Sequence, residues 1–320
     1  MDKNLIYKYA SFEDALKTIE NNCVVLNNPV NYNDPFDCQL DFDRKDEDKT
    51  IELLIEVFLV KEFFKIINNK QIKFKWHQKP IIFFVRNMFK FVLWATKKQH
   101  YYVSNPIYNL LVKRLLKNPD MINKSSSITL DEAKHEFINV MLPQLKELRN
   151  TALISCFSKE NNSILMWGHY ANKHSGVCIG FERPKDNFYD VSYSKKRVAF
   201  PLYELACIIC SYIMNDEEVD INNQNILKKG LRSFLTKSID WSYEKEVRCI
   251  FSLKELQNAN HIGEGRYLYE MPTKIKTIYL SCKISEQDKD TILNIAKEKK
   301  IDVYQFVESS LEYKLVIDNN

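Results

Sequence analysis

Glycine is scarce in this sequence, with six glycines in 320 residues. Loops that cradle phosphates need glycines at fixed spacing, because the backbone itself must approach the phosphate closely. Neither G-x-x-x-x-G-K-[ST] nor G-x-G-x-x-G occurs in the chain. The sequence therefore excludes these two glycine-built nucleotide sites.

Metal-binding motifs are missing as well. There is no H-E-x-x-H and no pair of C-x-x-C motifs, and His169 and His174 have no evident third ligand, so no metal is expected. The eight cysteines lack the regular spacing of a disulfide scaffold, and Cys207 and Cys210 lie in an apolar stretch, which indicates buried thiols. The first residues do not have the form of a signal peptide, so we expect a reducing, cytoplasmic location.

Neither charge nor apolar runs single out nucleic acid or a membrane as the partner. The net charge is +4, with 28% charged and 45% hydrophobic residues, which is typical of a soluble globular protein. The most apolar segment, residues 79–98, is interrupted by Arg86 and Lys90, and its apolar run falls short of the roughly 20 residues that a bilayer requires. It predicts a packed amphipathic helix and no membrane association.

Strand-like and helix-like segments at both ends of the chain predict an α+β fold. Residues 4–10 read as a strand, and Ser11 reads as the N-cap of a helix over 12–22. Similar patterns resume near residue 150. We expect a mixed β-sheet core with flanking helices, formed by residues 1–45 and 150–320, and an all-helical insertion at residues 46–149, where apolar residues recur at helical spacing.

The stretch WSYEKEVRCIF, residues 241–251, predicts a strand with one apolar and one charged face. Successive side chains of a strand point to opposite faces. One face is then apolar except for Lys245, and the other carries Glu244, Glu246 and Arg248 close together. Two interpretations stay open: an exposed network of ion pairs, or the floor of a functional cleft.

The segment NYNDPFD, residues 31–37, has the composition of a turn. Asp34 precedes a proline, which favours an extended backbone and leaves its carboxylate free to accept neighbouring backbone N–H groups. The alternative is that Asn33, Asp34 and Asp37 place polar atoms at the mouth of a cleft.

Residues 154–181 combine a strand, a short helix and a second strand. Ser158 ends the first strand shortly before a helix N-terminus, where unpaired backbone donors can meet a polar ligand. On the helix, His169 and Tyr170 lie on adjoining faces. The basic run at 195–197 reads as a solvated turn or as a phosphate contact.

Taken together and in this order, YKYASFEDALKTIENNCVVLNNPVNYNDPFD, ISCFSKENNSILMWGHYANKHSGVCIGF and WSYEKEVR resemble a bacterial family, the domain of unknown function numbered 2971. The resemblance spans most of the chain outside the helical insertion. It implies no activity, because none is attached to the family.

A more distant resemblance is to the ADP-ribosyltransferases that use NAD. Those enzymes begin with a strand that bears a basic residue, continue with a strand that bears a hydroxyl, and end with a strand that bears a catalytic glutamate, often as E-x-E. Here YKYAS, SCFS and YEKEVR occur in that order. The resemblance implies a catalytic set of Glu246, Glu244 and Ser158, with NAD as the substrate and Lys8 at the basic position.

The cleft implied by these motifs has further expected contacts. We expect the substrate-binding residues to be Lys8, Asn33, Asp34, Tyr170, His169 and Arg248. Cleavage of the nicotinamide–ribose bond passes through an oxocarbenium-like cation, which a fixed carboxylate stabilises. A hydroxyl can hold that carboxylate, and a lysine or arginine can neutralise the pyrophosphate.

The function expected first is therefore an NAD-consuming enzyme similar to ADP-ribosyltransferases, with a protein or nucleic-acid acceptor and a role in phage defence. Two alternatives stay open. One is a metal-dependent nuclease in which Asp34, Asp37 and Glu246 hold magnesium. The other is a non-catalytic sensor or partner-binding module of a defence system, with residues 49–149 as its working surface.

Overall fold

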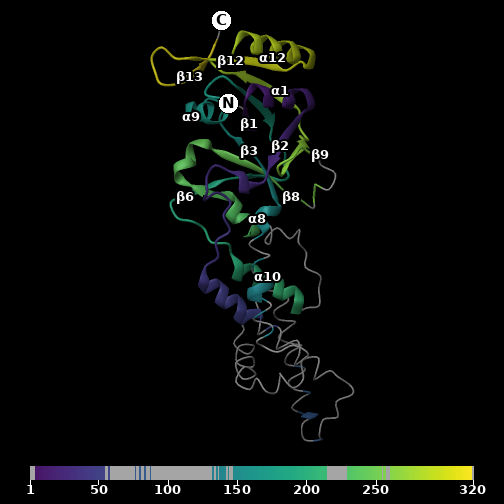
Figure 1. The fold of residues 1–320 in the computed structure, drawn as a ribbon. Coiled ribbons are helices and arrows are strands. Elements are labelled where there is room, and N and C mark those ends of the chain that lie inside the picture. The colour runs from purple at the N-terminus through teal and green to yellow at the C-terminus, as the bar shows by residue number, and fades with distance from the viewer. Residues whose placement is uncertain are drawn as a thin grey trace. The chain divides into compact units, whose positions relative to one another are not determined.

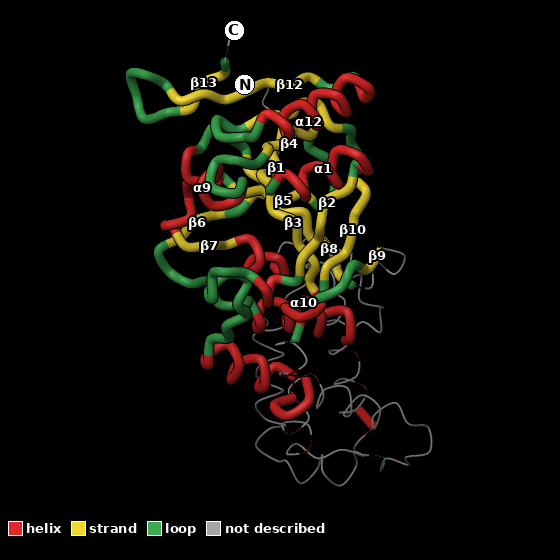
Figure 2. The backbone as a smooth tube through the Cα atoms, turned by 45° about the horizontal axis from the view of Figure 1, so that its top comes forward, coloured by secondary structure: helices red, strands yellow, loops and turns green. Residues whose placement is uncertain are grey.

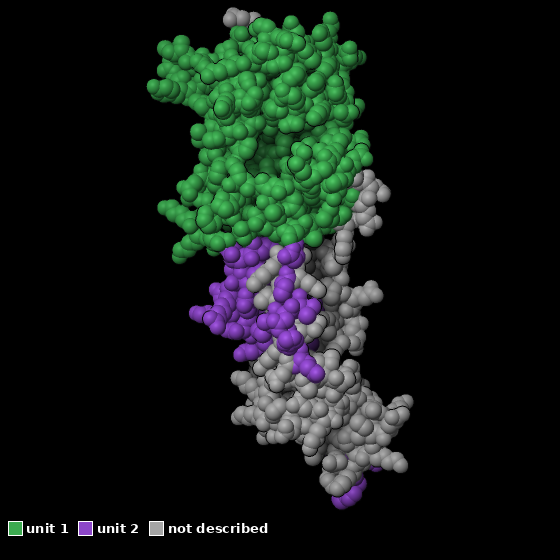
Figure 3. Space-filling model, in the orientation of Figure 1, with its two compact units in different colours: residues 1–39, 148–197, 234–320 green, residues 40–147, 198–233 purple. Residues whose placement is uncertain are grey.

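The computed structural model describes residues 4–54, 147–214, 229–253, 255–256 and 260–318, together with a few short runs and single positions between 57 and 143 (Figure 1). The chain divides into two compact units. Unit 1 consists of residues 1–39, 148–197 and 234–320, and unit 2 of residues 40–147 and 198–233 (Figure 3). The fold is α+β, as the sequence predicts, with helices flanking a large mixed sheet.

The sheet of unit 1 has eleven strands among the described residues. Its main path runs β13-β12-β11-β4-β1-β3-β2-β10-β9, and β8 pairs with β3 and with β5 off that path. Only β11 and β12 pair in parallel within it. The strands are β1 (Leu5–Ala10), β2 (Cys23–Asn27), β3 (Ala152–Ser158), β4 (Val177–Glu182), β5 (Phe188–Asp190), β8 (Glu246–Ser252), β9 (Asn260–His261), β10 (Arg266–Glu270), β11 (Ile275–Leu280), β12 (Asp302–Glu308) and β13 (Leu315–Ile317).

The sheet forks at β3. On one side β3 pairs with β8 over its whole length, from Ala152↔Ser252 to Ser158↔Glu246. On the other side it meets β1 only at Tyr7↔Ser158 and β2 only at Asn27↔Ile154. Among the described residues, the middle of β3 therefore has no strand partner on that side, and the Lys8 side chain of β1 reaches into the opening.

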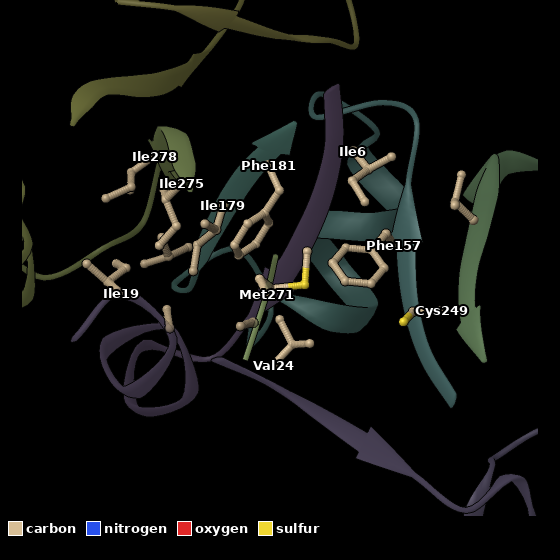
Figure 4. Packing of buried hydrophobic residues seen from close by; sticks show 14 of the residues in the cluster. Ile6, Ile19, Val24, Phe157, Ile179, Phe181, Cys249, Met271, Ile275 and Ile278 are labelled. Carbon is tan, nitrogen blue, oxygen red and sulfur yellow. The ribbon is translucent and has the colours of Figure 1, made fainter. Parts of the chain in front are cut away.

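One face of the sheet is covered by two helices, α1 (Phe12–Asn21) and α12 (Glu286–Lys299), which lie side by side in Figure 2. The Ser11 hydroxyl accepts a hydrogen bond from the Asp14 N–H at 3.2 Å, so the predicted N-cap is confirmed. The buried cluster between helices and sheet includes Ile19, Phe157 and Phe181 (Figure 4). Burying such side chains stabilises the fold by about 1.5–3 kcal/mol each.

The opposite face is covered by α9 (Ile164–Tyr170). Tyr7 and Tyr9 of β1 pack there against Trp167, which is fully buried. The Trp167 indole N–H donates to the Asn161 carbonyl at 2.8 Å, so its polar atom is satisfied. This packing fixes α9, and with it Tyr170, against the edge of β1.

The shorter elements connect these layers. The turn η3 (Leu231–Leu235) leads directly into a short strand, Thr236–Ser238, which pairs in parallel with Ser192–Ser194. The remaining short elements are β6 (Ser192–Ser194), β7 (Thr236–Ser238), α8 (Leu148–Thr151) and the helical turns η1 (Pro29–Asn31), η2 (Phe137–Met141) and η4 (Ile239–Glu244).

The described part of unit 2 contains α10 (Leu202–Met214) and a helical stretch at residues 44–54. Phe200, Leu202 and Leu205 form a buried cluster with Leu40 and Phe42. Cys207 and Cys210 are buried free thiols, as predicted. Most of the predicted insertion, including the segment 79–98, lies outside the described residues. Within the described residues, no helix has the length and apolar character needed to cross a membrane.

Candidate functional site

A pocket of about 290 Å³ lies in unit 1 at the fork of the sheet. Figure 3 shows a hollow on this unit at the height of β2 and β3 in Figure 1, which has the same orientation. The side chains that line the pocket come from β1, β2, β3, α9, the loop after β2, and the segment from β7 to β8: Tyr7, Lys8, Tyr9, Asn27, Asn31, Tyr32, Asn33, Asp37, Ile154, Cys156, Phe157, Ser158, Met166, Tyr170, Lys237, Glu244 and Glu246.

Lys8 fills part of the opening in the sheet. Its ammonium donates to the Ser155 hydroxyl and to the Cys156 carbonyl, both at 2.9 Å, and lies 5.3 Å from the Phe157 ring centroid. Burial lowers the pKa of Lys8 from its ordinary value, although nearby acidic groups oppose the shift. Among the described residues no carboxylate lies within ion-pair distance of this ammonium. The pocket wall thus presents a cation without a paired anion.

Glu244 reaches the pocket from a helical turn, which corrects the prediction of one continuous strand from residue 241. The 3₁₀ turn η4 begins at the N-cap Ser238, whose hydroxyl accepts from the Asp240 N–H, and ends at Lys245 with φ 46°. That left-handed residue reverses the chain, and β8 starts only at Glu246. Glu244 and Glu246 therefore converge through a turn.

Lys237, on β7, lies between three carboxylates. Its Nζ is 2.6 Å from Glu244 Oε2, 3.4 Å from Glu246 Oε2 and 3.6 Å from Asp37 Oδ2. Burial alone would lower the pKa of Lys237, but the carboxylates outweigh burial and raise it. The ammonium therefore stays charged and holds both glutamates at the pocket. Lys237 was not among the residues predicted from the sequence.

Arg248 fixes Glu246 from the buried side. The guanidinium is fully buried, and its Nε and Nη2 donate to the two oxygens of Glu246 at 2.7 and 3.1 Å. Nη2 also donates to Asp37 Oδ2 at 2.7 Å, and Nη1 donates to Cys38 Sγ and the Phe234 carbonyl. All five N–H groups of an arginine are thereby used within the protein. Arg248 is absent from the pocket lining, so it was wrongly expected to contact the substrate; it holds two residues of the lining, Asp37 and Glu246, from behind.

The two glutamates have opposite pKa shifts. Burial raises the pKa of Glu244 above its ordinary value, and Lys237 only partly compensates. Burial would also raise the pKa of Glu246, but Arg248 and Lys237 outweigh it and lower that pKa to about 2. Glu246 is consequently ionised at neutral pH although its side chain is buried.

We expect the buried Glu246 to make stability fall in acid. Because its pKa is about 2 when folded and 4.5 ordinarily, the unfolded chain takes up the proton first as the pH falls. The resulting stabilisation, about 3 kcal/mol, is complete well above pH 4.5 and disappears as the pH falls through about 2. Urea unfolding from about pH 7 to pH 3 measures this drop in the free energy of unfolding. A drop in Glu246→Gln as large as that in the wild type would contradict the prediction.

Ser158 and Tyr170 hold Glu244 at its two ends. The Ser158 hydroxyl donates to the Glu244 carbonyl at 2.7 Å and accepts from the Glu160 N–H at 3.0 Å. The Tyr170 hydroxyl donates to Glu244 Oε1 at 2.6 Å. Burial and this carboxylate both raise the pKa of Tyr170. Ser158 therefore fixes the backbone of the turn, and Tyr170 fixes its carboxylate.

The remaining predicted residues divide between the pocket and the surface. Asn33 lines the pocket and is exposed. Asp34 is buried but absent from the lining, and its carboxylate accepts from the Phe36 N–H at 2.9 Å, as in an ordinary turn. His169 is exposed outside the pocket, with its ring centroid 6.3 Å from those of Tyr170 and Tyr243.

A metal site among these acids would have to replace an ammonium. Asp37, Glu244 and Glu246 converge, but the position between them is taken by Lys237. Within the described residues, no group of three His, Cys, Asp or Glu side chains has the arrangement of a metal site. Formally, three carboxylates surround two cations, so the cluster carries one excess negative charge.

Comparison with known proteins reaches one family. Residues 166–249 match the family described as "Protein of unknown function (DUF2971)". This segment runs from α9 into β8 and contains Tyr170, Lys237, Glu244 and Glu246. The match supports the resemblance to that family over this part of the chain, but the N-terminal motif lies outside it. No curated protein and no solved structure matches the chain.

Proposed function

We propose that unit 1 is an NAD-consuming enzyme similar to ADP-ribosyltransferases, with its site in the pocket at the fork of the sheet. The observation that carries the proposal is the convergence of Lys8, Ser158, Glu244 and Glu246 on one pocket, from β1, β3, η4 and β8. Those elements follow each other in the order that the resemblance implies. The pocket also contains aromatic walls suited to a flat ring.

In the proposed reaction Glu246 stabilises positive charge on the ribose. The bond between the ribose C1′ and the nicotinamide nitrogen breaks, and its electron pair neutralises the pyridinium. The oxygen of water, or a nucleophile of a protein or nucleic acid, then forms the new bond to C1′ and releases its proton to the solvent. An ionised carboxylate in a dry site lowers the energy of the cationic transition state.

The arrangement around Glu246 supports this role because it fixes the carboxylate in advance. Arg248 holds both of its oxygens, and Lys237 lies 3.4 Å from one of them. The β8 backbone is held there as well, since the Glu246 N–H donates to the Tyr193 hydroxyl at 2.7 Å. A preorganised charge of this kind needs no rearrangement during the reaction.

Lys8 is proposed to bind the pyrophosphate of NAD, because its ammonium lines the pocket and has no carboxylate partner among the described residues. We expect Lys8→Met to weaken NAD binding by about 10- to 150-fold, the loss of one charged hydrogen bond. Nicotinamide riboside, which has no phosphate, should lose no affinity. Calorimetric titration of both ligands measures the difference.

The control for Lys8 is Lys17→Met, which removes an exposed lysine from α1. It should leave the affinity for NAD unchanged. Equal weakening of NAD and nicotinamide riboside by Lys8→Met would show that Lys8 supports the pocket without contacting phosphate.

The direct test of the proposed function is incubation of the purified protein with NAD, with and without protein and nucleic-acid acceptors. Chromatography should detect free nicotinamide in an amount equal to the ADP-ribose formed or transferred. Absence of nicotinamide with every acceptor, together with absence of NAD binding, would refute the proposal. Depletion or transfer of this kind is how the enzyme would act in phage defence.

The two alternative functions have less support. A magnesium-dependent nuclease would need Asp34, Asp37 and Glu246 to hold the ion. The Asp34 carboxylate, however, accepts from the Phe36 N–H outside the pocket lining, and Lys237 pairs with the other two carboxylates. A sensor module would use the segment 49–149, which falls mainly outside the described residues. Metal-dependent nicking of plasmid DNA by the protein would favour the nuclease over our proposal.

A further inference from the structure

A row of aromatic rings lies beside the pocket, on η4 and the end of α9. The ring centroids of Trp241 and Tyr243 are 6.1 Å apart, and those of Tyr243 and His169 are 6.3 Å apart. The row ends at Tyr170, 6.3 Å beyond His169. His169 is exposed and the other three are half-buried, so the row presents ring surface to solvent.

The row is continuous with the pocket at two points. Tyr170 lines the pocket and holds Glu244 through its hydroxyl. Lys237 also lines the pocket, and its Nζ lies 4.7 Å from the centroid of the Trp241 ring. A ligand that contacts the glutamates can therefore extend onto the row without leaving the protein surface.

The size of the pocket limits how much of an NAD molecule it can hold. At about 290 Å³ the pocket is at the lower end of the roughly 300–1,000 Å³ found for small-molecule sites. NAD consists of two nucleotides joined through phosphates. If the nicotinamide ribose lies against Glu246, the pocket has little room left for the adenosine half.

We infer that three rings of the aromatic row, those of Trp241, Tyr243 and His169, form the surface on which the adenine base of NAD stacks. The inference rests on the proposed function and extends it to the second half of the substrate. Every nucleobase has a flat π face, and stacking on an aromatic side chain contributes about 1–3 kcal/mol per base. Trp241 presents the largest ring of the row and is the residue to test.

The experiment compares two ligands that differ by the adenylate group. Affinities of NAD and of nicotinamide mononucleotide are measured by calorimetry for the wild type, Trp241→Ala and Trp241→Leu. We expect both variants to weaken NAD by about 5- to 150-fold. Nicotinamide mononucleotide should bind all three proteins equally. Because Lys237 contacts Trp241, this second ligand also reports whether the pocket itself is intact.

Tyr313→Ala is the matched control, since it removes a fully exposed aromatic side chain from the chain between β12 and β13. It should change neither affinity. Unchanged NAD binding in both Trp241 variants would overturn the stacking inference and leave the proposed function standing. An equal loss of affinity for NAD and for nicotinamide mononucleotide would overturn the stacking inference too. Binding of neither ligand to the wild type would refute the proposed function, and with it the inference.

Discussion

Glu246→Gln is expected to lower the rate of nicotinamide release by at least about 100- to 1,000-fold, the usual cost of removing one preorganised electrostatic group. The substitution keeps the shape of the side chain and removes its charge. Because the carboxylate acts on charge that develops in the transition state, NAD should bind with nearly unchanged affinity. Single-turnover release of nicotinamide and calorimetric binding of NAD measure the two effects separately.

The matched control is Glu182→Gln, at the solvent-exposed end of β4. It should leave both release and binding unchanged. Circular dichroism checks that the Glu246→Gln protein is still folded after the loss of the carboxylate that Arg248 binds. A folded Glu246→Gln protein that releases nicotinamide at the wild-type rate would remove Glu246 from the mechanism.

Arg248→Met is expected to lower the free energy of unfolding by about 3–5 kcal/mol. Removal of the guanidinium leaves Asp37 and Glu246 buried, at 3% exposure each, without their main cation. Leaving one buried charge without its partner costs far more free energy of unfolding than removing both partners. Urea unfolding at neutral pH measures the loss. The triple variant Asp37→Asn, Glu246→Gln, Arg248→Met should recover most of it, because neither the guanidinium nor the two carboxylates that it pairs with remain charged.

An exposed ion pair of equal length provides the control for Arg248. Arg183 Nη1 also lies 2.7 Å from a carboxylate, that of Asp190, but the Asp190 side chain is 53% exposed. Arg183→Met should therefore cost less than about 1 kcal/mol. Comparable losses in Arg183→Met and Arg248→Met would show that the buried network contributes no more than a surface pair.

Local patterns were sufficient to predict the fold class and several elements. Ser11 was expected to cap a helix, and its hydroxyl accepts the Asp14 N–H. The strand at 4–10 and the strand ending at Ser158 were expected, and they correspond to β1 and β3. Helix caps and strand patterns depend on residues close together in the sequence, so the sequence alone can reveal them. The fork at β3 depends on which strands pair, and no local pattern determines that.

The candidate site was predicted only in part, because some of its contacts join residues far apart in the sequence. The charges of Glu244, Glu246 and Arg248 lie in one short stretch of sequence, but Lys237 lies outside that stretch and was not predicted. The signal that could have found it is the Ser238 cap followed by Asp240, which starts a turn directly after Lys237. The pairing of Arg248 with Asp37 spans 211 residues and could not be read from spacing.

Exposure of the charged strand face was the other question that the sequence left open. Glu244 and Glu246 are each only 3% exposed, so an ordinary solvent-exposed ion network does not describe them. A strand-only pattern predicts which side chains share a face, whereas burial depends on η4 and the loop after β2 packing over that face. Those contacts come from segments distant in sequence.

Hydrogen exchange of Glu246→Gln with and without NAD shows whether NAD occupies the pocket of unit 1, since this variant should bind NAD without consuming it. The account predicts protection of backbone amides around β3, in the loop at 28–38 and from 236 to 246, the segments that surround the pocket. Unchanged exchange in all three segments at saturating NAD, or protection confined to unit 2, would contradict it.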